Sequence, residues 1–382
     1  MKIPSIFCVS ASDRYNYGDL LFPIVAKWQL EQCGPLSFHN VATVESNLSE
    51  VGALPTTGYD IFIDSDKHPS DATILIAGGQ VLNSDWMKLL SFIKPRWFRL
   101  YGKYDQHRLK RHVFRQFKLN NEPLPFMPSN GELLKNNRIM YHAVGGSVPS
   151  MPHKLGPFTQ ALKAAKYVSV RDLATRRALN NRAKQASQLV PDSVISYSDL
   201  KPKASLPRQC DEPYICVQFG YQKSKHKLVM ILKQLQRVYD EHGVKIGLLS
   251  IGNCPGHDDI KAAKWIKRHA AFPCFHLKHD HIDDITSALA HAKLFIGTSL
   301  HGAILSMTYN NPFVAVDKQI NKLDAYTKTW APEFLKGCVA YIEIARAVSQ
   351  RLNDYHDYSD LVAEQKAQVK KSFEHIYALS LR

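Results

Sequence analysis

The stretch that most constrains the fold of this chain is residues 293–317, KLFIGTSLHGAILSMTYNNPFVAVD. It opens and closes with short apolar runs, residues 294–296 and 313–316, each about the length of one buried strand. Between them lie a Gly-Thr-Ser turn and apolar residues at helical spacing. The pattern predicts a strand, a tight turn, a helix and a second strand. In an open parallel sheet such a turn lies at the carboxyl edge, where ligands bind.

His301 stands at the start of the predicted helix. A helix N-terminus offers free N–H groups and a partial positive charge, which suit a phosphate or a carboxylate. A histidine at this place can donate a hydrogen bond to the anion or move a proton. A structural interpretation is also open, in which His301 hydrogen-bonds a neighbouring strand.

The same alternation of strand, polar or Gly-containing turn and helix recurs along the chain. Predicted strands end before the polar loop that contains Gly18 and Asp19, and at the pairs Gly78-Gly79 and Gly145-Gly146. Further strands and helices are expected at residues 166–172, 173–184, 214–219, 225–242, 245–251, 258–269, 274–277 and 283–291, and another strand near residues 338–342. Polar and permissive residues therefore gather at one sheet edge, a predicted cleft wall.

Chain length and a break in the pattern predict two domains. A chain of 382 residues exceeds what one core usually holds, and residues 201–213 are rich in proline and poor in apolar side chains. We expect an N-terminal domain at 1–200, a linker at 201–213, and a C-terminal domain at 214–382 that ends in a helical region. Two successive βα alternations predict an α/β protein with two Rossmann-like, doubly wound domains facing each other across a cleft.

The bulk composition bounds the partners and the compartment. A net charge of +15 favours acidic partners such as nucleotides, phosphorylated substrates or an anionic membrane surface. Seven scattered cysteines without a CxxC pair indicate neither disulfides nor zinc, and we expect no metal. No apolar run reaches the length of a membrane span, and the N-terminus is typical of a first strand rather than a secretory signal. We expect a cytoplasmic protein.

Residues 94–130 interrupt the first domain as an insertion. Its first part, 94–118, carries nine Lys and Arg against one Asp, interleaved with six aromatic residues. This pattern suits peripheral contact with an anionic membrane surface or a lipid phosphate. A solvated helix pair with its aromatic side chains in the core is an equally weighted interpretation. Nucleic acid is not expected, because no recognised binding motif accompanies the segment.

Taken together in their order, the motifs resemble the polysaccharide pyruvyl transferase family. The matching features run with gaps from about residue 8 to 330 and are Asn16-Tyr17-Gly18-Asp19, Ala77-Gly78-Gly79, Val170-Arg171-Asp172, Pro191-Asp192, Leu300-His301-Gly302 and Pro312. The resemblance implies a GT-B-like fold. It also implies an enzyme that moves pyruvate from phosphoenolpyruvate to two hydroxyls of a sugar on a surface polysaccharide or lipopolysaccharide precursor, releasing phosphate. No cofactor besides this donor substrate is implied.

Such a reaction needs cations for the donor, a proton donor for its methylene carbon and a base for the sugar hydroxyls. The expected catalytic residues are His301 and Asp19. The expected substrate-binding residues are Asn16, Gly18, Gly78, Gly79, Arg171, Asp192, Ser299, Gly302, Lys318 and Lys322.

Structural interpretations stand beside these roles. Asp19 can cap a helix that begins at Leu20, and Arg171-Asp172 can form a salt-bridged helix start. Glycines such as Gly78 can serve turns that need positive φ, and Asp192 can hold the linker. The acidic pair at 258–259 precedes a predicted helix, whose dipole it would complement.

Ser299 departs from the family pattern, which commonly has arginine two residues before the histidine. A serine cannot replace the bidentate contact of a guanidinium with a carboxylate. The sequence therefore leaves alternatives to phosphoenolpyruvate as the donor substrate. The first alternative is a GT-B glycosyltransferase that uses a nucleotide sugar. A second is a protein without catalytic activity that binds phosphate or nucleic acid.

Overall fold

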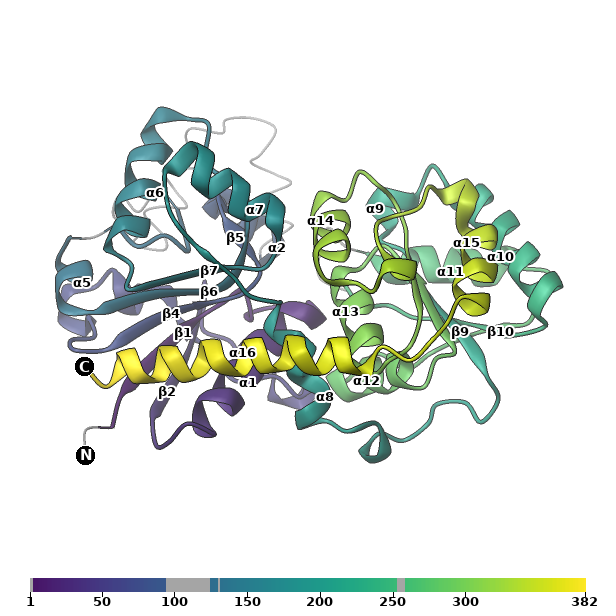
Figure 1. Ribbon diagram of the computed structural model, residues 1–382, viewed down its shortest axis with the longest axis horizontal. Helices are drawn as coiled ribbons and strands as arrows, with labels where there is room; N and C mark the ends of the chain where they lie inside the picture. The colour runs from purple at the N-terminus through teal and green to yellow at the C-terminus, as the bar shows by residue number, and fades with distance from the viewer. Residues whose placement is uncertain (1–2, 94–123, 130, 253–257) are drawn as a thin grey trace.

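The computed structural model describes residues 3–93, 124–129, 131–252 and 258–382. The chain forms two α/β domains that lie next to each other, each with a parallel sheet covered by helices (Figure 1). This is the predicted fold class. The basic and aromatic segment 94–118 lies outside the described residues.

The first domain contains a sheet in the order β3-β2-β1-β4-β6-β7-β8, with β5 paired to β6, and the paired strands run parallel. Its central strand β4 has the sequence TILIA and is buried along its whole length, as expected of a parallel sheet covered on both faces. The strands are β1 (Ser5–Val9), β2 (Ser37–Ala42), β3 (Thr57–Gly58), β4 (Thr73–Ala77), β5 (Gln80–Leu82), β6 (Arg138–Gly146), β7 (Tyr167–Val170) and β8 (Gln188–Leu189). The helices are α1 (Tyr17–Glu31), α2 (Trp86–Ile93), α5 (Gly131–Asn136), α6 (Pro152–Ala164), α7 (Leu173–Ala178) and α8 (Tyr197–Leu200).

The second domain repeats this plan with a five-stranded parallel sheet in the order β11-β10-β9-β12-β13. The order reverses between β9 and β12, so the carboxyl ends of these strands flank the crevice where α/β sheets bind ligands. The strands are β9 (Tyr214–Gln218), β10 (Lys245–Leu248), β11 (Cys274–His276), β12 (Leu294–Gly297) and β13 (Phe313–Ala315). The helices are α9 (Tyr221–Ser224), α10 (Leu228–His242), α11 (Asp259–His269), α12 (Ile282–Ala290), α13 (Leu300–Thr308), α14 (Asn321–Trp330) and α15 (Ile344–Asn353).

Several predicted elements differ from the observed ones. Helix α1 begins at Tyr17 and not at Leu20. The helix predicted at 173–184 divides into α7 and a π-helical turn, Leu179–Ala183, which ends at Lys184 with a positive φ. The strand predicted near 338–342 is wrong: one bridge joins Val316 to Val339, and a 3-10 helix, Tyr341–Glu343, follows. The Glu343 carboxylate accepts a hydrogen bond from the Ala340 N–H at 2.7 Å, which favours a helical turn over further pairing.

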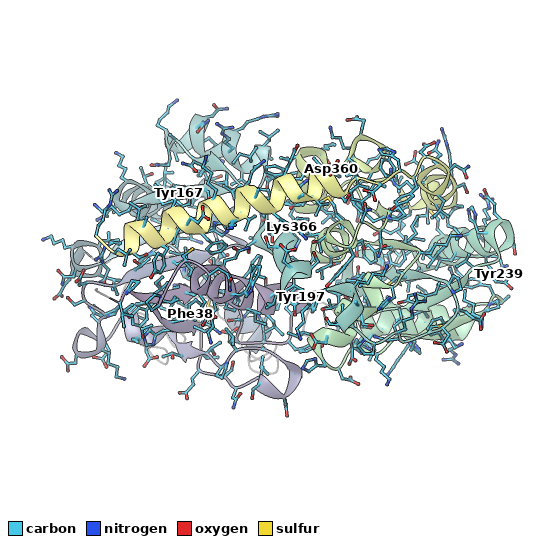
Figure 2. The ribbon with its side chains drawn as sticks, turned by 60° about the horizontal axis from the view of Figure 1, so that its bottom comes forward. Phe38, Tyr167, Tyr197, Tyr239, Asp360 and Lys366 are labelled. Carbon is cyan, nitrogen blue, oxygen red and sulfur yellow. The ribbon has the colours of Figure 1, made fainter. Side chains whose placement is uncertain are left out.

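The C-terminal helix α16 (Ser359–Ser380) returns to the first domain (Figures 1 and 2). Its Phe373 and Ile376 are fully buried in a core cluster that also contains α1 side chains. The Ser372 Oγ lies 2.9 Å from His142 Nδ1 on β6, and the Thr73 hydroxyl donates to Ser380 Oγ at 2.9 Å. The predicted domain boundaries assigned residues 359–380 to the second domain by sequence order, whereas helix α16 packs against the first domain.

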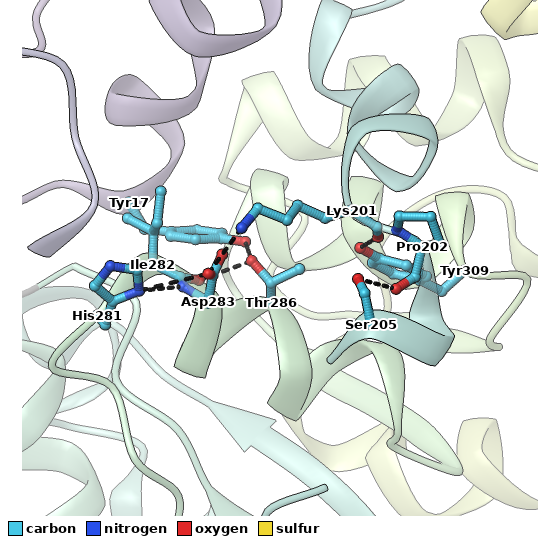
Figure 3. Close-up of polar contacts among 9 residues, drawn as sticks. All are labelled: Tyr17, Lys201, Pro202, Ser205, His281, Ile282, Asp283, Thr286 and Tyr309. Atoms are coloured by element: carbon cyan, nitrogen blue, oxygen red, sulfur yellow. Dashed lines mark hydrogen bonds and ion pairs between the residues drawn. The ribbon is translucent and has the colours of Figure 1, made fainter. Parts of the chain in front are cut away.

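Polar contacts join the two domains next to the start of α1 (Figure 3). The Tyr17 hydroxyl lies 2.7 Å from Thr286 Oγ1 on α12, and Lys201 forms an ion pair with Asp283 at 2.9 Å. An isolated antiparallel bridge also pairs Asn16 with Gly252. The loop before α1 is therefore held between the domains. Across the described residues, no helix combines the length and apolar character that crossing a membrane requires.

Candidate active site

A cavity of about 560 Å³ lies between the two domains, at the carboxyl ends of their central strands. It is bordered by the loop after β1, the turn after β4, the start of α7 and the segments around α9, α11, α13 and α14. Eight of the twelve predicted site residues line it: Asn16, Asp19, Gly78, Gly79, Arg171, Ser299, His301 and Lys322.

The other four predicted residues do not line the cavity. Gly18, Asp192 and Gly302 lie behind its wall: Gly18 contacts His301, Asp192 pairs with Arg171, and Gly302 contacts Phe295 of β12. A Cβ on Gly302, for example, would lie 2.4 Å from the Phe295 ring, so glycine allows α13 to pack closely on β12. Lys318 lies outside the site: its side chain is 64% exposed and its Nζ is 3.8 Å from a Glu343 carboxylate oxygen. Its predicted role in substrate binding has no geometric support.

His301 is brought to the cavity by the first turn of α13. Ser299 is the N-cap of this helix, and its Oγ accepts a hydrogen bond from the Gly302 N–H at 3.2 Å. The imidazole packs edge-on against Phe22 of the first domain, with the ring centroids 5.3 Å apart. Its Nε2 lies 3.9 Å from Asp192 Oδ2 and has no hydrogen-bond partner in the described part of the chain.

The charge state of His301 follows from its surroundings. Burial lowers the pKa of this imidazole well below its ordinary value, and the positive charges of Arg171 and Lys322 lower it further. The side chain is therefore neutral at pH 7, and one ring nitrogen is free to accept a proton.

Arg171 and Asp192 form a buried ion pair beside His301. The Arg171 Nη1 donates to Asp192 Oδ2 at 2.9 Å, and Nη2 donates to Gln80 Oε1 at 3.0 Å. The side chains are 1% and 0% exposed. Burial raises the pKa of Asp192, while the Arg171 charge lowers it. The predicted salt bridge between Arg171 and Asp172 is wrong in its partner: Arg171 pairs with Asp192, and Asp172 instead caps α7 by accepting a hydrogen bond from the Thr175 N–H at 2.7 Å. Arg171 also borders the cavity.

Asp19 lies in the first turn of α1 and does not cap that helix, which begins before it. The Asn16 side-chain amide donates to Asp19 Oδ2 at 2.6 Å. Burial raises the pKa of Asp19, and the positive charges of Arg14 and Lys322 act in the opposite direction. The Asn16–Asp19 pair thus presents hydrogen-bonding groups to the cavity from the first domain.

Gly78 has a conformational role at the turn after β4. Its φ of +67° is in the left-handed region, and a Cβ there would lie 2.4 Å from the Phe22 ring. The interpretation of Gly78 as a turn residue that needs positive φ is confirmed. The missing side chain also leaves room for the ring of Phe22, against which His301 packs.

Several cavity residues were not predicted. Arg14 follows β1 in the same loop as Asn16. It pairs with Asp13 at 3.3 Å and lies over the Phe92 ring at 5.4 Å. The unpredicted polar residues of the opposite wall are Gln218, Gln222, Lys223, Asp259 and Thr298. A usable signal existed for Gln218 and Thr298, since each directly ends a strand or follows one at the predicted ligand edge.

The cavity therefore has two unlike sides. Arg171 and Lys322 place positive charge near His301 and the start of α13, and Arg14 places positive charge near Asp19, which suits an anion such as a phosphate or carboxylate. Carboxylates, amides and hydroxyls elsewhere on the wall suit sugar hydroxyls. Within the described ranges, no group of three His, Cys, Asp or Glu side chains is arranged to hold a metal ion.

Solved structures with the same architecture confirm the fold. S. aureus MnaA solved with UDP aligns with a TM-score of 0.58 over 100% of this chain and 98% of that one, at 13% identity. The UDP-GlcNAc 2-epimerase from Methanocaldococcus jannaschii aligns with a TM-score of 0.54 over 98% and 99%, at 9% identity. At such identities the likeness establishes the fold, which is GT-B-like.

At the sequence level, no curated protein gives a significant match. The family profile described as polysaccharide pyruvyl transferase matches residues 16–318, which include all the predicted site residues except Lys322. The match spans most of both domains and the cavity between them. This chain is a transferase that belongs to the polysaccharide pyruvyl transferase family.

Proposed function

We propose that this transferase moves pyruvate from phosphoenolpyruvate to two hydroxyls of one sugar in a surface polysaccharide or its lipid-linked precursor. The observation that carries the proposal is the placement of His301. A neutral imidazole from the second domain lies at a helix N-terminus beside the Arg171–Asp192 pair of the first. Phosphoenolpyruvate requires this combination, because two anionic groups must be held while a neighbouring carbon receives a proton.

The residues divide the reaction between them as follows. Arg14, Arg171 and Lys322 bind the phosphate and carboxylate of the donor. The negative charge of the bound donor raises the pKa of His301, which burial and nearby cations otherwise lower. The imidazole gains a proton and delivers it to the methylene carbon, which becomes the methyl group.

The protonated donor has an electrophilic C2, and the sugar completes the exchange there. One sugar hydroxyl attacks C2 and gives its proton to the Asp19 carboxylate, and the bond between C2 and the phosphate oxygen breaks so that phosphate leaves. The second hydroxyl attacks the same carbon to close the ketal and gives its proton to the neutral imidazole of His301. Asp19 is placed to accept a hydroxyl proton, since its side chain borders the cavity and burial raises the pKa of its carboxyl above the ordinary value.

Ser299 is compatible with this donor. Its hydroxyl caps α13 and so helps to place His301. Two guanidinium groups border the cavity from the first domain, those of Arg14 and Arg171. We propose that they supply the carboxylate contact that an arginine at position 299 would otherwise make.

The alternative is transfer of a sugar from a nucleotide sugar. One observation favours it: a structure aligned over the whole of this chain was solved with UDP. The two donors make opposite demands on His301, because only pyruvyl transfer requires a proton donor to carbon.

Ligand-dependent thermal unfolding separates the two donors. Purified protein is compared with phosphoenolpyruvate, UDP and UDP sugars, each at about 100 times its Kd, where binding stabilises the fold by ~2.7 kcal/mol. We expect stabilisation by phosphoenolpyruvate, and its loss in Lys322→Ala. We also expect His301→Ala to abolish phosphate release from phosphoenolpyruvate. A response to UDP or a UDP sugar alone would contradict the proposal and favour the alternative.

We also propose that the protein works in the cytoplasm at the inner face of the membrane, where lipid-linked sugars are assembled. The basic segment 94–118 would supply the contact. Co-sedimentation with vesicles that contain or lack anionic lipid tests this. Equal recovery with both vesicles would contradict it.

A further inference from the structure

The second-domain wall of the cavity contains a buried carboxylate whose two oxygens differ. Asp259, at the start of α11, is 2% exposed and borders the cavity. Its Oδ2 accepts three hydrogen bonds, from Gln218 Nε2 at 2.7 Å, the Gly252 N–H at 2.8 Å and the Ile251 N–H at 3.1 Å. Its Oδ1 has no hydrogen-bond partner among the described residues. The three donors hold the carboxylate in one orientation and leave one oxygen available.

The surroundings of Oδ1 show what it can bind. A Cβ placed on Gly220 would lie 3.6 Å from Asp259 Oδ1 and 3.7 Å from Thr298 Oγ1, so both oxygens flank the bare face of Gly220. Thr298 accepts a hydrogen bond from the Gly220 N–H at 3.0 Å, and its hydroxyl is 3.5 Å from Gln218 Oε1. All three of Gly220, Thr298 and Asp259 border the cavity.

A carboxylate oxygen repels a phosphate and accepts a hydrogen bond from a neutral hydroxyl. An unpaired buried acceptor is costly, so a hydroxyl that reaches it gains more than one bound at the surface. Three of the four described Lys and Arg side chains that border the cavity, Arg14, Arg171 and Lys322, lie on the side of His301 and Asp19. The fourth, Lys223, lies on the wall of Asp259, where its charge lowers the pKa of that carboxyl. The side of His301 is therefore the more cationic and suits an anion, while the fixed carboxylate oxygen of Asp259 suits a hydroxyl.

We infer that Asp259 Oδ1, together with Thr298, binds a hydroxyl of the acceptor sugar and orients that sugar toward the donor beside His301. This inference rests on the proposed function and adds to it the group that positions the acceptor. A ribose hydroxyl of a nucleotide has the same chemistry, and the test below distinguishes the two sources.

The decisive variant is Asp259→Asn. Its amide oxygen replaces Oδ2 as the acceptor for the three donors, and its NH₂ replaces the charged Oδ1. Asp258→Asn is the matched control: it removes the same charge one residue earlier, from a side chain that pairs with Lys261 at 3.1 Å and does not border the cavity.

Binding is measured calorimetrically with phosphoenolpyruvate alone, with UDP alone, and with a panel of methyl hexopyranosides added to the phosphoenolpyruvate-bound protein. We expect Asp259→Asn to weaken one glycoside about 10- to 100-fold, the usual loss for a hydrogen bond to a charged group. Phosphoenolpyruvate binding should be retained in both variants. Removal of one sugar hydroxyl should weaken binding to the wild-type protein and to Asp258→Asn, but not weaken binding to Asp259→Asn further.

Three results would overturn the inference. They are equal glycoside affinity in Asp259→Asn and wild type, a panel in which no glycoside binds the wild-type protein, and a loss confined to UDP, which would identify the hydroxyl as that of a ribose. The proposed donor is judged separately, because phosphoenolpyruvate binding to the wild-type protein is measured without any sugar.

Discussion

Gly18 of the first domain lies directly against the imidazole of His301 from the second. A Cβ on Gly18 would be 1.6 Å from His301 Nδ1, a distance that no two unbonded atoms can share. His301 can therefore lie beside Arg171 and Asp192 only because position 18 of α1 is a glycine, which has no side chain. A residue that borders no part of the cavity thus controls its chemistry.

Gly18→Ala should displace His301 and reduce pyruvyl transfer at least 100-fold, since a misplacement of about 1 Å can cost that much. Steady-state kinetics with phosphoenolpyruvate measures the effect. Gly156→Ala is the control, because a Cβ at this α6 position meets no atom within 4 Å. It should leave the rate unchanged and stabilise the helix by about 0.5–1 kcal/mol. Equal rates in the two variants would contradict the role given to Gly18.

Two lysines four residues apart should behave differently. Lys322 borders the cavity and lowers the pKa of His301, whereas Lys318 is exposed beside Glu343. Lys322→Ala should raise the KM for phosphoenolpyruvate about 10-fold or more, the usual loss of a charged hydrogen bond. Lys318→Ala should change it less than two-fold, the order of an exposed ion pair. A larger effect at position 318 would show that the donor binds elsewhere.

The two lysines also illustrate what sequence could predict. The βα alternation predicted both sheets, because apolar runs of strand length recur between helical patterns and each ends in a polar turn. Residues adjacent to strand ends, such as His301 and Arg171, could therefore be placed at the cavity. Lys318 and Lys322 belong to a loop and a helix start after β13, where no periodic pattern tells which side chain turns inward.

The hydrogen bonds of Asp259 could not be predicted from the sequence, for a different reason. Next to a predicted helix it was interpreted as a complement to the helix dipole, which is true of many acidic residues in a first turn. Its three hydrogen bonds come from residues 218, 251 and 252, and only tertiary structure brings them together. The return of α16 to the first domain was also beyond prediction, because order along the chain does not determine which domain a long terminal helix contacts.

Variants of the Arg171–Asp192 pair should change the free energy of unfolding and the binding of phosphoenolpyruvate independently. Arg171→Met leaves a fully buried carboxylate unpaired and should lower the free energy of unfolding by about 3–5 kcal/mol. Adding Asp192→Asn should recover part of that loss, as urea unfolding would show. Phosphoenolpyruvate binding should stay weak in both, because the guanidinium is missing from each. If the double variant is no more stable than the single one, Asp192 is not ionised in the folded protein.

Asp259 should give the protein a measurable pH dependence. Burial raises its pKa from 3.8 to about 6 in the folded protein. The folded state therefore binds the proton more tightly, and the stability from this group is present below pH 3.8 and lost as the pH rises through 6. Asp259→Asn carries no such charge, so its unfolding free energy relative to wild type should increase across that window by up to about 3 kcal/mol.

Chemical unfolding at pH 5, 6 and 8 measures this difference, and Asp258→Asn serves again as the control. The gain of Asp259→Asn over wild type should be larger at pH 8 than at pH 5. Parallel curves would mean that the carboxyl titrates as it does in water, and would weaken the case for a buried acceptor.

The position of α16 has a consequence for how this protein is made. Its Phe373 and Ile376 complete the core over α1 and β6, so the first domain keeps an apolar face uncovered until residues 359–380 have been synthesised. At ~5–20 residues per second, that interval lasts roughly 10 to 40 s after the first domain has left the ribosome. Throughout this time the nascent chain exposes an apolar surface that α16 covers in the folded protein, and this surface is accessible to other exposed chains and to chaperones.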